Sequence, residues 1–427
     1  MISNTFSIAS SGLRAAQLGL DVTSHNVANV NTPFYVRENL NLQEQRFQPL
    51  PLYPGSGVQA TVEKATGYDL NRVGDIIANK ANANEAGILN DKLYNALSNS
   101  KLPNTLNDIY NAFADLSANP SSLTARQVVI EKTEQLKTQT NQLNNTISEI
   151  NDDIAFNNSV DVNKFNELLN SLSKANEAGM DDIPKRADLL NQLNEIASVQ
   201  TNDNGKTIFL KNKNGGLTPI LQGNSKTDVT KEQLENALSG RVSARKEFQT
   251  NTMPGVLTDV DKVLDKALNN LNDWHKQGYD LNGNPGKDLF NIGNGNFTIT
   301  TTGLSKEEIA ASSTPTTPTN GNNANAIFEK GANDLRSVND AVGVALAKLG
   351  TLISNSNSLA EGYQSGYDNA LRDWNNKYGV NLDEEAVNTM KYQRMYEANA
   401  KVLQVADSMI GTLLSIKAWK RYRYDYK

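Results

Sequence analysis

The sequence predicts a mainly α-helical protein with a smaller β part, in which the two ends of the chain pair as coiled-coil helices. Three observations lead to this fold class. Apolar residues repeat with heptad spacing at both chain ends, a third heptad run lies in the interior, and short alternating segments interrupt the helical pattern. Heptad spacing is typical of helices that pack along a seam, and alternation is typical of half-buried strands.

The composition limits the classes of protein to consider. With 427 residues the chain exceeds a single small core, so several folded units are expected. Only 38% of the residues are hydrophobic, which indicates much exposed surface or apolar stripes that neighbouring subunits cover. The net charge of -6 gives no reason to expect nucleic-acid binding. The chain has no cysteine, which excludes disulfides and thiolate chemistry.

The two chain ends carry the most regular pattern. The N-terminal seam predicts a helix of about eight turns that ends before Pro33. We expect it to pair with the C-terminal helix, because each has an apolar stripe to cover. The seam residues are Ile2, Phe6, Ala9, Leu13, Ala16, Leu20, Thr23, Val27 and Val30 at the N-terminus, and Met395, Ala398, Val402, Val405, Met409, Thr412 and Ile416 at the C-terminus.

Helical pattern dominates the interior, with β segments between. Residues 58–63 alternate as a strand would. A long helix follows the start signal Asn119-Pro120-Ser121-Ser122, and its seam is Val129, Thr133, Leu136, Thr140, Leu143, Ile147, Ile150 and Ile154. Residues 207–210 and 218–221 flank an Asn-Gly-Gly turn and predict a hairpin. Helices resume near residue 253 and again after an expected exposed loop at residues 311–325.

Neither a cleavable signal nor a membrane span is expected. The N-terminus has no cation before Arg14, and no run of about 18 apolar residues occurs. An extracellular location would therefore require a route that reads no cleavable signal.

Ordered motifs at both ends resemble those of flagellar rod, hook and hook-associated proteins. The N-terminal set is Ser11-Gly12-Leu13, Leu20-Asp21 and the run Asn26-Val27-Ala28-Asn29-Val30-Asn31-Thr32. The C-terminal set is residues 379–385 (GVNLDEE) with 392–394 (YQR) and 396–402 (YEANAKV), which resembles the closing motif of the first hook-associated protein family. Internal segments around Phe113 to Arg126 and Trp274 to Asn284 are similar to that family as well.

The resemblance implies a structural subunit that forms a ring at the hook–filament junction of the bacterial flagellum, is extracellular, and leaves through the flagellar type III system. It implies as partners other copies of the chain, the hook protein, the second junction protein and an export chaperone, with no nucleic acid and no membrane. By resemblance, subunit assembly is assigned to Phe6, Leu13, Leu20, Val27, Met395, Val402, Val405, Met409 and Ile416, and chaperone binding to Val402, Val405, Met409 and Leu413.

The expected domains follow from these patterns. Residues 1–45 with 385–427 form a terminal-helix axial domain, residues 46–200 with 240–384 form an elongated helical-bundle domain with small β elements, and residues 201–239 form a reduced β-containing middle insertion. The alternative is a distal-rod or hook subunit, which shares the N-terminal signature. The GVNLDEE motif and the long helix after Pro120 favour the junction protein.

The sequence departs from the family pattern at two places. After Thr32-Pro33 the family typically has glycine, where this chain has Phe34, and glycine would permit a positive φ, so this turn is expected to differ. The basic and aromatic residues 417–427 extend past the expected end, and contact with neighbouring subunits is our preferred hypothesis for them.

Nothing in the sequence indicates catalysis, a cofactor or a metal. Ser24 and His25 are adjacent, so on a helix their side chains point about 100° apart, which is unsuited to a nucleophile and its base. His275 is expected to cap or pack at a helix end. The calcium-like run from Asp280 has Pro285 in the sixth position and Asn291 in the twelfth, where a calcium loop needs glycine and glutamate, so a tight turn is expected.

Overall fold

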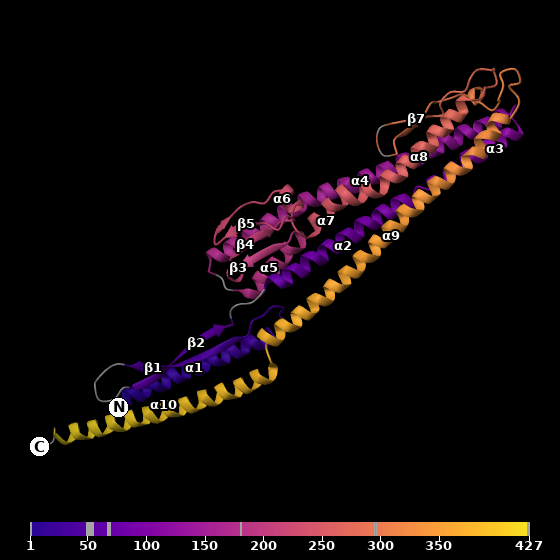
Figure 1. The fold of residues 1–427 in the computed structure, drawn as a ribbon. Helices are drawn as coiled ribbons and strands as arrows, with labels where there is room; N and C mark the ends of the chain where they lie inside the picture. The colour runs from indigo at the N-terminus through magenta and orange to yellow at the C-terminus, as the bar shows by residue number, and fades with distance from the viewer. Residues whose placement is uncertain are drawn as a thin grey trace.

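The computed structural model describes residues 2–47, 55–65, 70–179, 182–293, 295 and 297–424. The molecule is elongated, with both chain ends at one extremity and the segment around β7 at the other (Figure 1). The helices are α1 Ile2–Ala28, α2 Leu70–Asn99, α3 Leu102–Ala118, α4 Leu123–Glu177, α5 Ile183–Ile196, α6 Lys231–Glu235, α7 Arg241–Glu247, α8 Met253–Lys276, α9 Asn322–Tyr378 and α10 Leu382–Tyr424. The strands are β1 Glu38–Phe47, β2 Gly55–Lys64, β3 Val199–Asn202, β4 Thr207–Lys211, β5 Leu217–Gln222, β6 Ser225–Lys226, β7 Phe290–Ile292 and β8 Ile299–Thr301.

Long helices build an outer bundle at the end of the molecule that is far from the chain termini. The bundle combines α3 and α8 with parts of α2, α4 and α9 around one apolar core. Helix α4 begins where the sequence predicts, because the Ser122 hydroxyl accepts a hydrogen bond from the Ala125 amide as an N-cap. All eight predicted seam residues of α4 are buried. The predicted helical bundle is therefore confirmed.

A second core lies nearer the terminal helices. It joins α5 and the four-stranded antiparallel sheet β3-β4-β5-β6 to the second half of α4 and to the last turns of α9. The predicted hairpin is β4 paired with β5, and Gly215 in its turn has φ 80°, a conformation that glycine adopts without strain. The small β part thus packs on the long helices instead of standing apart.

The terminal region consists of α1, the antiparallel hairpin β1–β2 and α10. Helix α10 runs along α1, and the hairpin packs on another side of α1 (Figure 1). The predicted pairing of the two chain ends is present. Among the described residues, none of the helices has the length and apolar character that crossing a bilayer would need.

One local expectation was correct only in part and one was wrong. Residues 313–321 form the expected exposed loop, but the loop is shorter than residues 311–325, because Ala311 and Ser312 are fully buried and α9 already begins at Asn322. Hydrogen bonds from the Asn323 and Ala324 amides to the Ala311 carbonyl hold this segment on the start of α9. Phe34 takes the left-handed conformation with φ 59°, which the sequence reasoning reserved for glycine.

Candidate assembly site on the terminal helices

The contact between α1 and α10 depends on two glycines. A Cβ atom added at Gly12 would lie 2.5 Å from the side-chain oxygen of Asn399, and one added at Gly19 would lie 2.6 Å from the Tyr392 ring. Gly19 follows Gly12 by seven residues, whereas its contact Tyr392 precedes Asn399 by seven residues. The two helices are therefore antiparallel. Glycine in a helix interior costs about 0.5–1 kcal/mol relative to alanine, and the close helix approach explains why it is present here.

Two polar side chains of α1 attach the hairpin. The Ser11 hydroxyl accepts a hydrogen bond from the Val58 amide at 3.1 Å and donates one to the Ile8 carbonyl. The buried Asn26 side chain pairs with the backbone of Glu38: its amide nitrogen donates to the Glu38 carbonyl, and its oxygen accepts from the Glu38 amide, each at 2.9 Å. Ser11 and Asn26 therefore have structural roles that the motifs alone did not reveal.

The predicted assembly residues of α1 lie beside this contact and not in it. The small members of the seam, Ala9 and Ala16, are buried, whereas Phe6 and Val27 are almost half exposed. Leu13 and Leu20 are partly buried. The larger apolar side chains thus remain available along the edge of the helix pair.

The predicted residues of α10 form an exposed apolar stripe. Val402, Val405, Met409 and Leu413 are between 43% and 55% exposed, and they repeat at steps of three and four residues, which places them on one face of the helix. Met395 is partly buried. Ile416 lies in α10, but its side chain is outside the part of the chain whose side chains are described.

An apolar groove follows this stripe. It has a cavity volume of about 490 Å³ and is lined by Thr5 of α1 with residues of α10. The α10 residues that line it are Ala398, Lys401, Val402, Val405, Ala406 and Met409. The groove suits apolar side chains from another helix, because its lining carries one charged group, the Lys401 amine.

The heptad seam predicted that α1 would cover this stripe, whereas the resemblance assigned the same residues to contacts with other proteins; in the structure α1 leaves the stripe exposed. The face of α10 that contacts α1 is marked instead by Tyr392, Asn399 and Ala406, at steps of seven residues. The signal that could have found this face is the pair Gly12 and Gly19, since two helix-interior glycines seven residues apart indicate a close helix crossing.

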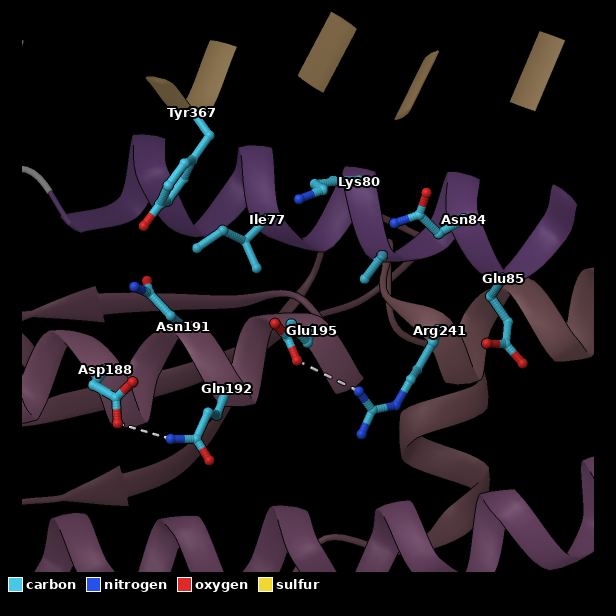
Figure 2. Close-up of a pocket in the computed structure, with 11 residues that line it drawn as sticks. Ile77, Lys80, Asn84, Glu85, Asp188, Asn191, Gln192, Glu195, Arg241 and Tyr367 are labelled. Atoms are coloured by element: carbon cyan, nitrogen blue, oxygen red, sulfur yellow. Dashed lines mark hydrogen bonds and ion pairs between the residues drawn. The ribbon is translucent and has the colours of Figure 1, made fainter. Parts of the chain in front are cut away.

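A polar cleft lies between α2 and α5 in the second core region (Figure 2). Its cavity volume is about 540 Å³. Its charged groups already have partners within the chain: the Asp188 carboxylate accepts from Gln192 at 2.8 Å, and Glu195 lies 3.6 Å from the Arg241 guanidinium. The first of these interactions lies within α5, and the second joins α5 to α7.

Buried ion pairs hold α7 against two further helices. The Asp161 carboxylate of α4 accepts hydrogen bonds from Arg241 and Arg245 of α7, and Arg245 also donates to Glu85 of α2 at 2.6 Å. The two guanidinium groups hold the pKa of Asp161 below its usual value although burial opposes this. Three helices are thereby joined at one point.

The two histidines occupy structural positions. His25 is exposed on α1, with its Nδ1 atom 3.5 Å from the Glu38 carboxylate. His275 is fully buried at the end of α8: Nδ1 lies 2.5 Å from the Lys287 carbonyl, and Nε2 accepts from the Ala310 amide at 2.8 Å. Burial lowers the pKa of His275 to about 4, so the ring is neutral and donates through Nδ1.

The calcium-like run is a tight turn, as expected. The Asp280 carboxylate accepts hydrogen bonds from the Asn282 and Asn284 amides, both at 2.8 Å, and Gly283 has φ 78°. Across the described ranges, no group of three or more His, Asp or Glu side chains lies close enough together to hold a metal ion.

Three protein-family models match separate parts of the chain. Residues 90–290 match the helical domain of the flagellar hook-associated protein FlgK. Residues 376–416 match the C-terminal part of the flagellar basal body rod proteins FlgEFG, and residues 6–35 match the flagella basal body rod protein. The two terminal matches fall on α1 and α10, and the central match falls on the outer bundle and the second core.

Whole-chain similarity agrees with these matches. Flagellar hook-associated protein 1 of Escherichia coli (strain K12) is 25% identical, over 97% of this chain and 100% of that protein. The protein of the same name from Bacillus subtilis (strain 168) is 22% identical, over 94% of this chain and 96% of that protein. The solved flagellar hook junction protein FlgK from Burkholderia pseudomallei is similar with a TM-score of 0.46 at 15% identity, over 52% of this chain and 47% of that chain.

The helix pair formed by the two chain ends and the matches at both ends indicate a structural protein of the flagellum. Within this class, the chain is similar to flagellar hook-associated protein 1 in its helical domain and over nearly its whole length. The family that the motifs resemble is confirmed.

Proposed function

We propose that this chain is a structural subunit of the junction between the flagellar hook and filament, where copies of it form a ring. The observation that carries the proposal is the exposed apolar stripe of α10, Val402, Val405, Met409 and Leu413, beside a helix pair that is already closed by Gly12 and Gly19. An assembling helix needs such a second face, because its first face is used within the subunit.

The energetic argument is direct. Complete burial of one Val, Leu or Met side chain is worth about 1.5–3 kcal/mol, and about half of each stripe side chain remains exposed in the single subunit. An exposed stripe is also a hazard before assembly, since it promotes nonspecific association. Both points favour a second helix, from a neighbouring copy, as the partner of the stripe.

The proposal extends to the domains and partners. Residues 1–45 with 385–427 form the axial layer, and residues 46–200 with 240–384, with the insertion 201–239, lie outward from it. The hook protein and the second junction protein are the neighbours along the axis. An export chaperone covers Val402, Val405, Met409 and Leu413 before the subunit leaves the cell through the flagellar type III system.

A distal-rod or hook subunit is the alternative. The terminal matches are compatible with it, because their descriptions refer to basal body rod proteins. The match of residues 90–290 to the hook-associated helical domain supports the junction instead.

The test replaces two stripe residues in a bacterium in which this chain is the only copy of its kind. The variant Val405→Asp with Met409→Asp places two charges on the stripe, and the expected result is hooks without filaments by electron microscopy, with loss of motility. The control is Val344→Asp on α9, a site 69% exposed and away from the stripe, which is expected to keep filaments. Filaments in the stripe variant at the parental number would contradict the assembly role.

The chaperone role is measured separately. Protease treatment of the purified chain, with and without the candidate chaperone, shows whether α10 is protected, and the stripe variant is expected to lose that protection. Equal protection of parent and variant would exclude the four residues as the chaperone contact while leaving the assembly role open to its own test.

A further inference from the structure

Residues 34–38 form a contact between the terminal region and the end of α9. We call residues 34–38 the joint segment. The chain itself passes between the two regions from β2 to α2 and from α9 to α10. The joint segment connects α1 to β1 and includes Glu38, the first residue of β1. Its contacts with α9 and α10 therefore add a noncovalent attachment to the two covalent ones.

The Phe34 ring is inserted between aromatic side chains of α9. It is 3% exposed, and its centroid lies 5.4 Å from the Trp374 ring and 6.4 Å from the Tyr367 ring, both edge-on. Edge-to-face pairs at such distances are attractive. Phe34 holds this position with φ 59°, a backbone region that is unfavourable for a bulky side chain. The contacts of the ring therefore offset a local strain.

Hydrogen bonds and ion pairs continue the attachment along the segment. The Trp374 indole donates to the Tyr35 carbonyl at 3.3 Å, and the Arg37 amide donates to the Tyr378 carbonyl at 2.9 Å. The Arg37 guanidinium donates to Glu385 at 2.6 Å and also pairs with Glu384. Glu385 is 1% exposed and Arg37 is partly buried, so salt screens the Arg37–Glu385 pair less than an ion pair on the open surface.

The opposite side of the segment is fixed to α1. Asn26 holds the Glu38 backbone through two hydrogen bonds, and its oxygen also accepts from the Tyr35 hydroxyl at 3.0 Å. The segment is thus bonded to α1 on one side and to α9 and α10 on the other. A segment bonded on both sides transmits the orientation of one region to the other.

We propose that the joint segment is a lock that fixes the angle between the terminal helix pair and the long helices. Without this lock, the short linkers would leave the two regions free to rotate, because small interfaces between domains of one chain permit relative motion. With the lock, the direction of the outer domains is set within each subunit. This property belongs to the single subunit and does not depend on what the subunit joins.

The test uses spin labels on both sides of the joint in the full-length chain. The chain has no cysteine, so Gln17→Cys on α1 and Ser365→Cys on α9, both exposed positions, are the only labelled sites. Double electron–electron resonance spectroscopy then gives the distribution of distances between the two labels. A single narrow distribution is expected for the parent.

The decisive variant is Phe34→Gly. Glycine adopts φ 59° without strain, so the backbone can keep its conformation while the contacts of the ring are lost. The expected distribution is about twofold wider or more, because unlocked regions sample several angles. The variant Arg37→Gln keeps the ring and removes the ion pairs, and a smaller widening is expected. Phe156→Ala, at a phenylalanine that is 70% exposed on α4, is the control and is expected to match the parent.

Two results would overturn the lock. One is a distribution in Phe34→Gly as narrow as the parental one, which would assign the rigidity to the linkers. The other is a broad distribution in the parent itself. Circular dichroism on each variant measures whether the terminal helices stay folded. If Phe34→Gly loses these helices, the distance distribution of Arg37→Gln becomes the test. A distribution in Arg37→Gln as narrow as the parental one would then refute the proposal.

Discussion

Acidification from pH 8 to pH 5 is expected to weaken the outer bundle through His275. The ring is fully buried, and burial lowers its pKa to about 4 from the ordinary value of 6.5. In the unfolded chain this histidine takes up a proton as the pH falls below 6.5, whereas in the folded chain it stays neutral until about pH 4. The stability that it contributes is therefore present above pH 6.5 and is lost as the pH falls towards 4.

The magnitude follows from the difference between the two pKa values. Each unit of difference corresponds to about 1.4 kcal/mol, which gives about 2 kcal/mol lost at pH 5 and about 3 kcal/mol when both titrations are complete. Protonation would also convert Nε2 from an acceptor into a donor facing the Ala310 amide. The hydrogen bond that holds the segment before α9 would then be lost.

The assay compares the parent with His275→Gln, whose amide keeps a donor and an acceptor but does not titrate. Urea unfolding between pH 8 and pH 5 is followed by tryptophan fluorescence, because Trp274 precedes His275 at the end of α8. The parent is expected to lose about 2 kcal/mol more than the variant over this range. Carboxylates titrate in both chains, so they cancel in the difference. Equal pH dependence in the two chains would refute the assignment of a neutral, buried His275.

Three further predictions follow from the same geometry. Gly19→Leu is expected to cost about 1–3 kcal/mol by overpacking against the Tyr392 ring, measured as faster proteolysis of both chain ends, with Gln17→Leu on the exposed face of α1 as the control. Arg245→Met leaves Asp161 with one guanidinium partner in place of two, and is expected to cost about 3 kcal/mol in urea unfolding; no loss would mean that water replaces the guanidinium. Asp265 has its pKa raised to about 6 by burial and by Asp261, so it disfavours folding above pH 6, and Asp265→Asn is expected to raise the melting temperature at pH 7.5 but not at pH 4.

An element of the fold could be predicted from its local sequence pattern where the element has only one buried face. Helix α4 has its N-cap at Ser122, and every residue of its predicted seam is buried. The hairpin β4–β5 has its turn at Asn214-Gly215-Gly216. In both cases the same few residues set the local conformation and the buried face, so periodicity and turn chemistry are sufficient.

The faces of α1 and α10 could not be assigned in this way, because each helix carries two stripes. One serves the contact within the subunit, through Gly12 and Gly19 on α1 and through Tyr392 and Asn399 on α10. The other consists of large apolar residues and stays exposed, as at Val405 and Met409. Hydrophobic periodicity gives more weight to the large apolar residues, so it finds the exposed stripe and misses the face that packs within the subunit.

The contacts of the joint segment could not be predicted from the sequence for a different reason. Arg37 and its partner Glu385 are 348 positions apart in the sequence, and nothing local to either residue indicates the other. At Phe34 the local rule gave the wrong expectation, since a positive φ is ordinarily a property of glycine. Burial of the ring against Trp374 decided the conformation instead. At this position, a left-handed backbone conformation that glycine would adopt without strain is therefore stabilised by a side-chain contact.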